Sequence, residues 1–162
     1  MANSKIATTR FELRRRLSME EYMKKISDVM TRDVQVANPD DTIQKAATMM
    51  AKADVGSLPV GENDRLVGMV TDRDIVLRAV AEGRDLKTSV RDVMTAHIHY
   101  CFDDEDVTAV AENMAGLKVR RLAVLSRDKR LVGIVALSNV TNSGEAKASS
   151  ELLKGVAEPH HK

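Results

Sequence analysis

The chain contains an internal repeat, and this duplication limits its fold more than any other feature. Asp28-Val29-Met30-Thr31 returns 64 residues later as Asp92-Val93-Met94-Thr95, and Leu66-Val67-Gly68 returns 65 residues later as Leu131-Val132-Gly133. Most matched positions are apolar, which indicates one small motif built twice and kept for its core. Two such units form a pseudo-symmetric pair, with a ligand expected in the cleft between them. Positions at which the copies differ therefore carry most information about function.

Composition sets broad bounds on the class of protein. A chain of 162 residues with 43% hydrophobic and 30% charged residues is typical of a soluble globular protein with one domain or two small ones. The net charge of +1 provides no broad field that would attract nucleic acid or a membrane. No stretch approaches the roughly 18 apolar residues of a membrane span, and Met1 to Arg16 lack the apolar region of a signal peptide. We therefore expect a cytoplasmic protein.

Hydrophobic periodicity predicts the same order of elements in both copies, strand–helix–strand–strand–helix. In the first copy these are a strand at 34–37, a helix with an apolar stripe at Ile43, Ala46, Ala47 and Met50, strands at 58–60 and 66–70, and a helix from about 72 to 82. In the second copy they are a strand at 98–101, a helix at 107–117 and strands at 122–125 and 131–135. The predicted fold class is α+β (α/β-like), with two β-α-β-β-α units packed as a pseudo-two-fold pair.

The motifs of both copies resemble those of a known family. The segment Gly68-Met69-Val70-Thr71-Asp72-Arg73-Asp74 follows a Leu-Pro-Val strand and is similar to the signature that closes a CBS motif. The leading Asp-Val-Met-Thr of each copy fits the same family, and the resemblance covers residues 26 to about 142. It implies a Bateman module, which pairs two CBS motifs, binds adenosine-containing ligands and regulates rather than catalyses. The expected divisions are an N-terminal extension with a short helix at 1–25, CBS motifs at 26–84 and 90–143, and a C-terminal helix and tail at 144–162.

The signature also has its own chemistry. Thr71 ends a strand and opens a helix, where unpaired backbone N–H groups and a hydroxyl suit a phosphate. Asp74 is placed to accept hydrogen bonds from both ribose hydroxyls, and Arg73 is placed to approach the phosphate. The alternative is structural, because Thr-x-x-Asp is close to a capping box in which Thr71 and Asp74 only satisfy the start of the helix.

The second copy departs from the signature. Ala136 replaces the hydroxyl of Thr71, and Asn139 replaces the carboxylate of Asp74, with Ser138 between them. Losing charge-assisted hydrogen bonds to a ribose should cost about 1.5–3 kcal/mol of binding free energy. We therefore expect one good nucleotide site near the first signature and one weak site at Ala136, Ser138 and Asn139.

The walls of the pocket follow from the resemblance rather than from spacing. The residues implied as contacts to the adenine are Val34, Val36, Val55, Gly56, Leu58 and Pro59, with Thr31 and Ser57 as additional hydrogen-bonding residues. Arg120 and Arg121 suit a di- or triphosphate. A solvated strand end explains the two arginines equally well.

Other candidate sites are weaker. His97 and His99 share one face of a predicted strand, but no third ligand at suitable spacing joins them, so we expect no metal site. Cys101 is the single cysteine, which excludes an internal disulfide, and it lies in an apolar run typical of a core residue. No arrangement of a nucleophile and a base is recognisable, so an enzyme is not expected.

The two ends of the chain carry further predictions. Ser18-Met19-Glu20-Glu21 forms a capping box, which predicts a helix beginning at Ser18. Seven Lys or Arg against three Glu in residues 1–25 suit a solvated helix that packs on the module, although an arm that binds nucleic acid or a membrane would have the same composition. Residues 146–156 are predicted to form a terminal helix that packs against a partner subunit.

The sequence thus predicts a stand-alone CBS-pair protein without a catalytic cofactor. It is expected to bind an adenine nucleotide (AMP, ADP or ATP) between its two motifs and to act in trans on an unknown protein target. The alternatives are a sensor of NAD or S-adenosylmethionine, or a ligand-free structural module for dimerisation. A homodimer is expected because helix stripes exceed what one sheet pair can cover; they contain Val76, Leu77, Val80, Val110 and Met114.

Overall fold

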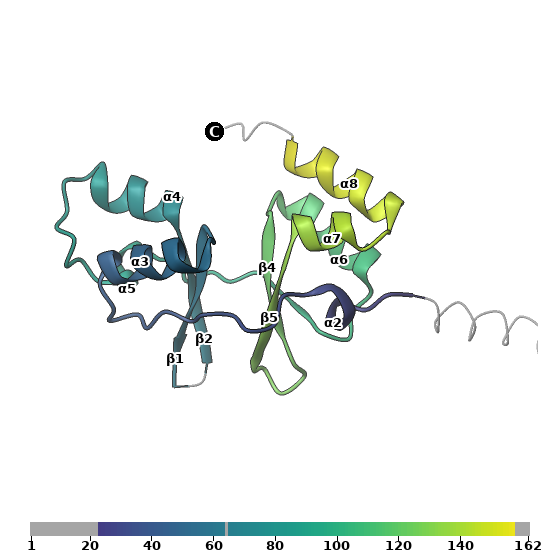
Figure 1. Cartoon of the computed structure of the whole chain (residues 1–162), viewed down its shortest axis with the longest axis horizontal. Helices are drawn as coiled ribbons and strands as arrows, with labels where there is room; N and C mark the ends of the chain where they lie inside the picture. Colours follow the sequence, from purple (N-terminus) through teal and green to yellow (C-terminus); the bar gives the residue numbers. More distant parts are fainter. Residues whose placement is uncertain (1–22, 64, 158–162) are drawn as a thin grey trace, which may run out of the picture.

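The structure is a computed structural model that describes residues 23–63 and 65–157. Two halves of similar build lie side by side, each with a small sheet toward the middle and helices on the outside (Figure 1). The predicted fold class is confirmed, since both copies contain the expected helix and antiparallel strand pair. The helix predicted at Ser18 and the end of the C-terminal tail lie outside the described residues.

The first half contains α3 (Ile43–Ala53), the antiparallel pair β1 (Ser57–Glu62) and β2 (Arg65–Thr71), one turn of α-helix α4 (Asp72–Ile75), and a π-helical turn η1 (Val76–Val80). Thr42 caps α3 by accepting a hydrogen bond from the backbone N–H of Lys45. The predicted helix at 72–82 is therefore present but changes its hydrogen-bond pattern after one turn.

The second half repeats the plan and adds a helix. Its elements are β3 (Tyr100–Phe102), α6 (Val107–Leu117), β4 (Arg121–Leu125), β5 (Leu131–Ala136), α7 (Leu137–Asn142) and α8 (Ala146–Ala157). β3 pairs with β4 in parallel, and β4 pairs with β5 antiparallel. The prediction for α6 is confirmed, whereas the strand predicted at 98–101 begins two residues later.

The strand predicted at 34–37 is not a strand in the structure, because this segment crosses from one half to the other. At its start Thr31 bridges to Ile134 of β5, and at its end Ala37 bridges to Val60 of β1. The segment therefore runs beside each sheet for only one residue. The second copy crosses in the opposite direction, where Thr95 bridges to Met69 of β2.

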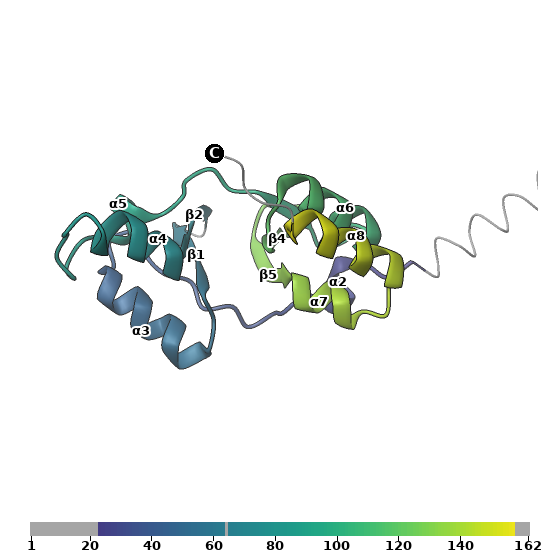
Figure 2. The ribbon, with the colours of Figure 1, turned by 90° about the horizontal axis from the view of Figure 1, so that it is seen from above.

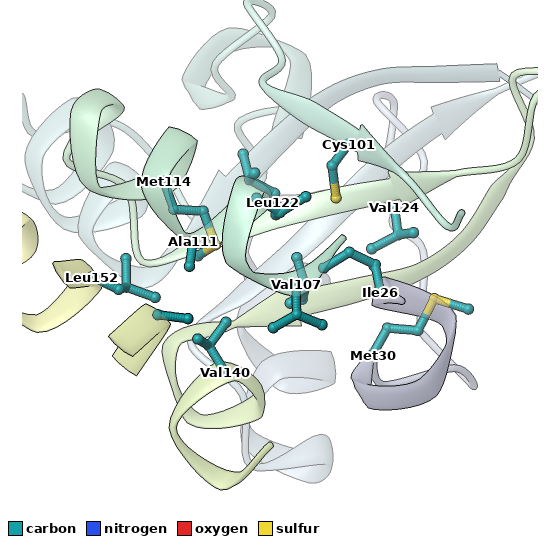
Figure 3. Close-up of a cluster of buried hydrophobic side chains, with 13 residues drawn as sticks. Ile26, Met30, Cys101, Val107, Ala111, Met114, Leu122, Val124, Val140 and Leu152 are labelled. Carbon is teal, nitrogen blue, oxygen red and sulfur yellow. The ribbon is translucent and has the colours of Figure 1, made fainter. Parts of the chain in front are cut away.

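Each half also receives a helical turn from the other copy. The short helix α2 (Ile26–Val29) belongs to the first copy by sequence, yet Ile26 and Met30 pack in the core of the second half (Figure 3). In return α5 (Val90–Val93) places Val90 and Val93 in the core of the first half. Fully burying such a side chain contributes about 1.5–3 kcal/mol, so this exchange joins the two halves into one folding unit.

The helix α8 covers the second half only. It lies over α6 and α7 (Figure 2), whereas in the first half α3 contacts the short helix α4. Gly155 allows this close approach, because a Cβ at that position would lie 2.6 Å from the Cβ of Ala115. One face of this helix therefore packs on its own chain, and its contact with a partner subunit stays a prediction.

This cover explains which apolar stripes are buried. Val110 and Met114 are fully buried, so they belong to the part of the predicted stripes that forms the core. In α3, Ile43, Ala46 and Met50 are buried as predicted, but Ala47 is exposed. Across the described part of the chain, no helix has both the length and the apolar character needed to cross a membrane.

Candidate functional site

The first signature forms a closed hydrogen-bonded pair at the start of α4. The hydroxyl of Thr71 donates to Asp74 Oδ2 at 2.7 Å, and the backbone N–H of Thr71 donates to the same oxygen at 3.0 Å. The backbone N–H of Asp74 donates to Thr71 Oγ1, also at 3.0 Å. Thr71 and Asp74 thus form the reciprocal capping box that the structural alternative predicts.

A third residue connects this pair to the second repeat. Arg78 Nη2 lies 3.3 Å from Asp74 Oδ1, and Arg78 Nη1 donates to the backbone oxygen of Val93 at 2.7 Å and to Thr95 Oγ1 at 3.1 Å. The side chain of Asp74 keeps 16% of its surface exposed. Because a carboxylate has about four acceptor positions, Oδ1 retains the capacity to accept a further hydrogen bond.

The second copy makes the same connection with a different residue. Asn139 Oδ1 accepts from the backbone N–H of Ala136 at 2.8 Å, while Asn139 Nδ2 donates to the backbone oxygen of Val29 at 2.9 Å and to Thr31 Oγ1 at 3.3 Å. Val29 and Thr31 are the repeat counterparts of Val93 and Thr95. One neutral amide therefore replaces the Asp74–Arg78 pair, and both of its N–H groups are already used.

Most of the remaining predicted residues belong to one of these two places. Ser57 pairs with Thr71 in the β1–β2 register, and Gly56 accepts a hydrogen bond from the backbone N–H of Asp72. We call the set near the first signature the Thr71 group; it contains Gly56, Ser57, Thr71, Arg73 and Asp74. Arg73 is exposed, and Ser57 is buried.

The set at the second signature and on the crossing segment that follows Thr31 is called the Thr31 group; it contains Thr31, Val34, Val36, Arg120, Arg121, Ala136, Ser138 and Asn139. Arg121 pairs with Ala136 in the β4–β5 register, and the backbone oxygen of Arg120 accepts from the N–H of Leu137. Both arginine side chains are exposed. The backbone of Arg120 and Arg121 therefore lies beside the second signature, and their contact with a phosphate stays a prediction.

Three of the predicted wall residues belong to neither group. Leu58 is 1% exposed and packs in the core of the first half, and Pro59 is also buried. Val55 lies outside this core and is 40% exposed. A ligand at the Thr71 group would reach Leu58 only after the core had opened.

Sequence reasoning missed Arg78 and Thr95. The repeat offered a signal for Thr95, because it is the counterpart of Thr31 after the 64-residue shift. Arg78 offered none, since Ser143 occupies the corresponding position in the second copy and the π-helical turn that directs Arg78 toward Val93 leaves no mark in the sequence.

Two cavities open between the halves, on either side of the strand hairpins. One of about 670 Å³ is lined by Arg32, Val34, Val36, Gly61, Arg65, Leu66, Arg130 and Gly133, among others. The other, of about 790 Å³, is lined among others by Ala96, Ile98 and Tyr100, the repeat counterparts of Arg32, Val34 and Val36, and by Arg65, Lys129 and Arg130. The 64- and 65-residue shifts relate the two cavities, so they are pseudo-equivalent.

The weaker candidates of the sequence analysis are His97, His99 and Cys101. The rings of His97 and His99 lie edge to face with centroids 6.5 Å apart, and within residues 23–63 and 65–157 no cluster of three or more His, Cys, Asp or Glu suits a metal. Cys101 is 1% exposed. Its burial, with a smaller contribution from the charge of Glu105, raises the pKa of the thiol to about 12, so the thiolate is scarce at neutral pH.

Comparison with known proteins gives a consistent result. The CBS domain family model matches residues 26–80 and again residues 90–144. The CBS domain-containing protein YhcV of Bacillus subtilis (strain 168) is 40% identical over 118 residues, which cover 73% of this chain and 84% of that protein.

Two similar solved structures contain adenosine ligands. CBSX2 in complex with AMP has a TM-score of 0.65 and 28% identity, and the match covers 74% of this chain and 94% of that one. The CBS domain pair of MJ0100 in complex with 5′-methylthioadenosine and S-adenosyl-L-methionine has a TM-score of 0.69 and 25% identity, with coverage of 77% and 98%.

Proposed function

The chain belongs to the CBS domain family, and from this premise we propose that it is a regulatory module that binds one adenosine-containing ligand at the Thr71 group. An adenine nucleotide, AMP, ADP or ATP, is the first choice. The AMP of CBSX2 and the methylthioadenosine and S-adenosylmethionine of MJ0100 share an adenosine part, which supports this class of ligand. S-adenosylmethionine and NAD are the alternatives within the same class.

We choose the Thr71 group because of one observation. Asp74 can accept more hydrogen bonds from a ligand than Asn139 can. Among the described residues, Asp74 Oδ1 contacts Arg78 at 3.3 Å, and the Asp74 side chain is 16% exposed, so Oδ1 can accept from a ribose hydroxyl. Asn139 donates twice and accepts once within its own chain. A ribose at Asn139 would have to displace bonds that join the two repeats, which lowers its net affinity.

The Thr71 group also offers partners to the rest of a nucleotide. The hydroxyl of Thr71 donates to Asp74 in the free protein and can rotate toward a phosphate. Arg73 is exposed on the first turn of α4 and adds a cation next to it. Thr95 lies opposite, where Arg78 contacts it, so the second repeat supplies the other wall of the site.

The module would regulate a separate protein in trans and would form a homodimer. Val76, Leu77 and Val80 are each about half exposed along η1, at 53%, 49% and 61%. Their counterparts in the second repeat are the polar residues Thr141, Asn142 and Glu145. Only the first copy has apolar residues at these exposed positions. This difference supports a subunit contact on the first half.

A second candidate function is a ligand-free structural module. The closed capping box favours it, because Thr71 and Asp74 already satisfy one another. The two candidates differ in one measurable property, since only a binding module gains stability from a ligand.

A thermal-shift panel with AMP, ADP, ATP, NAD and S-adenosylmethionine at millimolar concentration tests the proposal. At least one ligand should raise the melting temperature of the wild type, and Asp74→Asn should abolish most of that rise. Asp72→Asn is the matched control, because it removes an exposed carboxylate from the same helical turn. No rise with any of the five ligands would favour the structural module.

A further inference from the structure

Two arginines occupy the same position in the two copies, at the mouths of the cavities between the halves. Arg65 begins β2 and Arg130 directly precedes β5, 65 residues apart, each followed by Leu-Val-Gly. Both are exposed, and both line both cavities. Both arginines therefore border the space that the two cavities share.

Neither arginine has a side-chain partner within the described ranges 23–63 and 65–157. The other cations around the cavities are engaged: Arg32 Nη2 donates to the backbone oxygen of Ser27 at 2.7 Å, and Lys129 Nζ donates to the hydroxyl of Tyr100 at 2.8 Å. Two unpaired like charges near one another repel. An anion between Arg65 and Arg130 would remove that repulsion.

The charges of the cavity linings favour an anion as well. Among the described lining residues, the smaller cavity has three arginines, Arg32, Arg65 and Arg130, and one carboxylate, Asp33. The described residues of the larger cavity include Arg65, Lys129 and Arg130 and one carboxylate, Asp128. The described lining of each cavity thus carries more positive than negative charge, although the whole chain has a net charge of only +1.

We propose that the space between the two hairpins binds a phosphate anion with several negative charges, which bridges Arg65 and Arg130. A guanidinium group binds phosphate through two parallel N–H···O bonds, so two guanidinium groups suit an anion with more than one phosphate. No residue of the Thr71 group lines either cavity. This anion site is therefore separate from the proposed nucleoside site and does not depend on it.

The anion would also hold the halves together. Arg65 belongs to the hairpin of the first half and Arg130 to that of the second, so a bridging anion adds a connection between them. An anion that contacts both hairpins stabilises the folded protein by mass action, since the unfolded chain does not bring the arginines together.

The test is calorimetric titration with sodium tripolyphosphate at constant ionic strength, without divalent metal. The wild type should bind one anion per chain, and Arg65→Gln or Arg130→Gln alone should each weaken binding by about tenfold or more. Arg84→Gln is the matched control, because Arg84 is an exposed arginine that pairs with Glu82 at 2.8 Å, away from the hairpins. It should leave binding unchanged.

Two further arms separate the sources of phosphate. Adenosine carries no phosphate, so its effect on the melting temperature should survive in the double variant Arg65→Gln/Arg130→Gln. If ATP but not tripolyphosphate binds in a manner that needs both arginines, the phosphates of a nucleotide are the source. If neither anion binds the wild type, or if the double variant binds both as tightly as Arg84→Gln does, the anion site is overturned, whatever adenosine does.

Discussion

The side-chain amide of Asn139 donates a hydrogen bond of 2.9 Å to the backbone oxygen of Val29, a residue 110 positions earlier in the chain. In the first repeat Arg78 donates to the backbone oxygen of Val93, the counterpart of Val29, at 2.7 Å. Both bonds join the helical segment after one hairpin to the last residue of the helical turn, α2 or α5, that comes from the other repeat. The difference between Asp74 and Asn139 therefore has a structural consequence as well as a chemical one.

The first prediction concerns the hydrogen bonds by which Asn139 joins the two repeats. Asn139→Ala removes one acceptor and two donated bonds at a partly buried position, so it should lower the free energy of unfolding by about 1–3 kcal/mol. Its effect on adenosine-ligand affinity should be small. Urea denaturation and calorimetry measure the two effects separately.

Asn139→Asp is the informative companion variant. It keeps an oxygen for the N–H of Ala136 but places a second carboxylate oxygen against the backbone oxygen of Val29, where no donor remains. It should be at least as destabilising as Asn139→Ala. An Asn139→Asp variant as stable as the wild type would show that the hydrogen bonds donated by Asn139 contribute nothing to the free energy of unfolding.

The second prediction concerns the cover that α8 provides. Leu152→Ala should destabilise the protein by about 2–5 kcal/mol, because Leu152 is fully buried against the core of the second half. Leu153→Ala, on the exposed side of the same helix, should be nearly neutral. Equal melting temperatures of the two variants would contradict the packing of α8 on its own chain.

The third prediction follows from the raised pKa of Cys101. At pH 8 a thiol reagent should not label the folded protein, because burial raises the thiol pKa to about 12, and labelling should become complete in denaturant. The neutral thiol is favoured by the fold, so stability should fall as the pH rises above about 9.0, the ordinary value, where only the unfolded chain ionises readily. Rapid labelling without denaturant at pH 8 would refute the burial of this residue.

The elements of the fold were predictable because they depend on local pattern. The apolar period of 107–117 and the turn between 58–60 and 66–70 fixed α6 and the β1–β2 hairpin within a few residues. The exchange of α2 and α5 between the halves was not predictable. Ile26 and Val90 are apolar, and an apolar side chain does not specify which of the two cores it packs in. The prediction of a strand at 34–37 was wrong for the same reason, because strand pairing depends on which sheet the segment lies beside.

The candidate site was predictable only in part. The Thr71–Asp74 spacing indicated both a capping box and a ligand contact, and the structure contains the capping box. The grouping of Val34 and Val36 with Thr71 came from the family resemblance, whereas the crossing segment places these valines in the lining of the cavity that also contains Gly133. Only the three-dimensional exchange of segments assigns each residue to one of the two groups.

The fourth prediction concerns assembly. Light scattering of the purified chain at micromolar concentration should give twice the mass of one chain, with the exposed residues Val76, Leu77 and Val80 at the contact. Leu77→Lys should produce a monomer, because it places a charge in an apolar contact. Leu153→Lys, on the exposed side of α8, should remain a dimer. The opposite pattern would move the subunit contact to the second half.

The most direct test of the central claim is a calorimetric titration of the purified chain with AMP. The account predicts one site per chain, and Asp74→Asn should weaken binding by about tenfold to a hundredfold, because a neutral amide replaces a charged acceptor. Asp72→Asn should bind AMP like the wild type and shows that the loss is specific to Asp74. Two equal sites per chain, or an Asp74→Asn variant with the affinity of the wild type, would contradict the proposal that the Thr71 group alone holds the ligand.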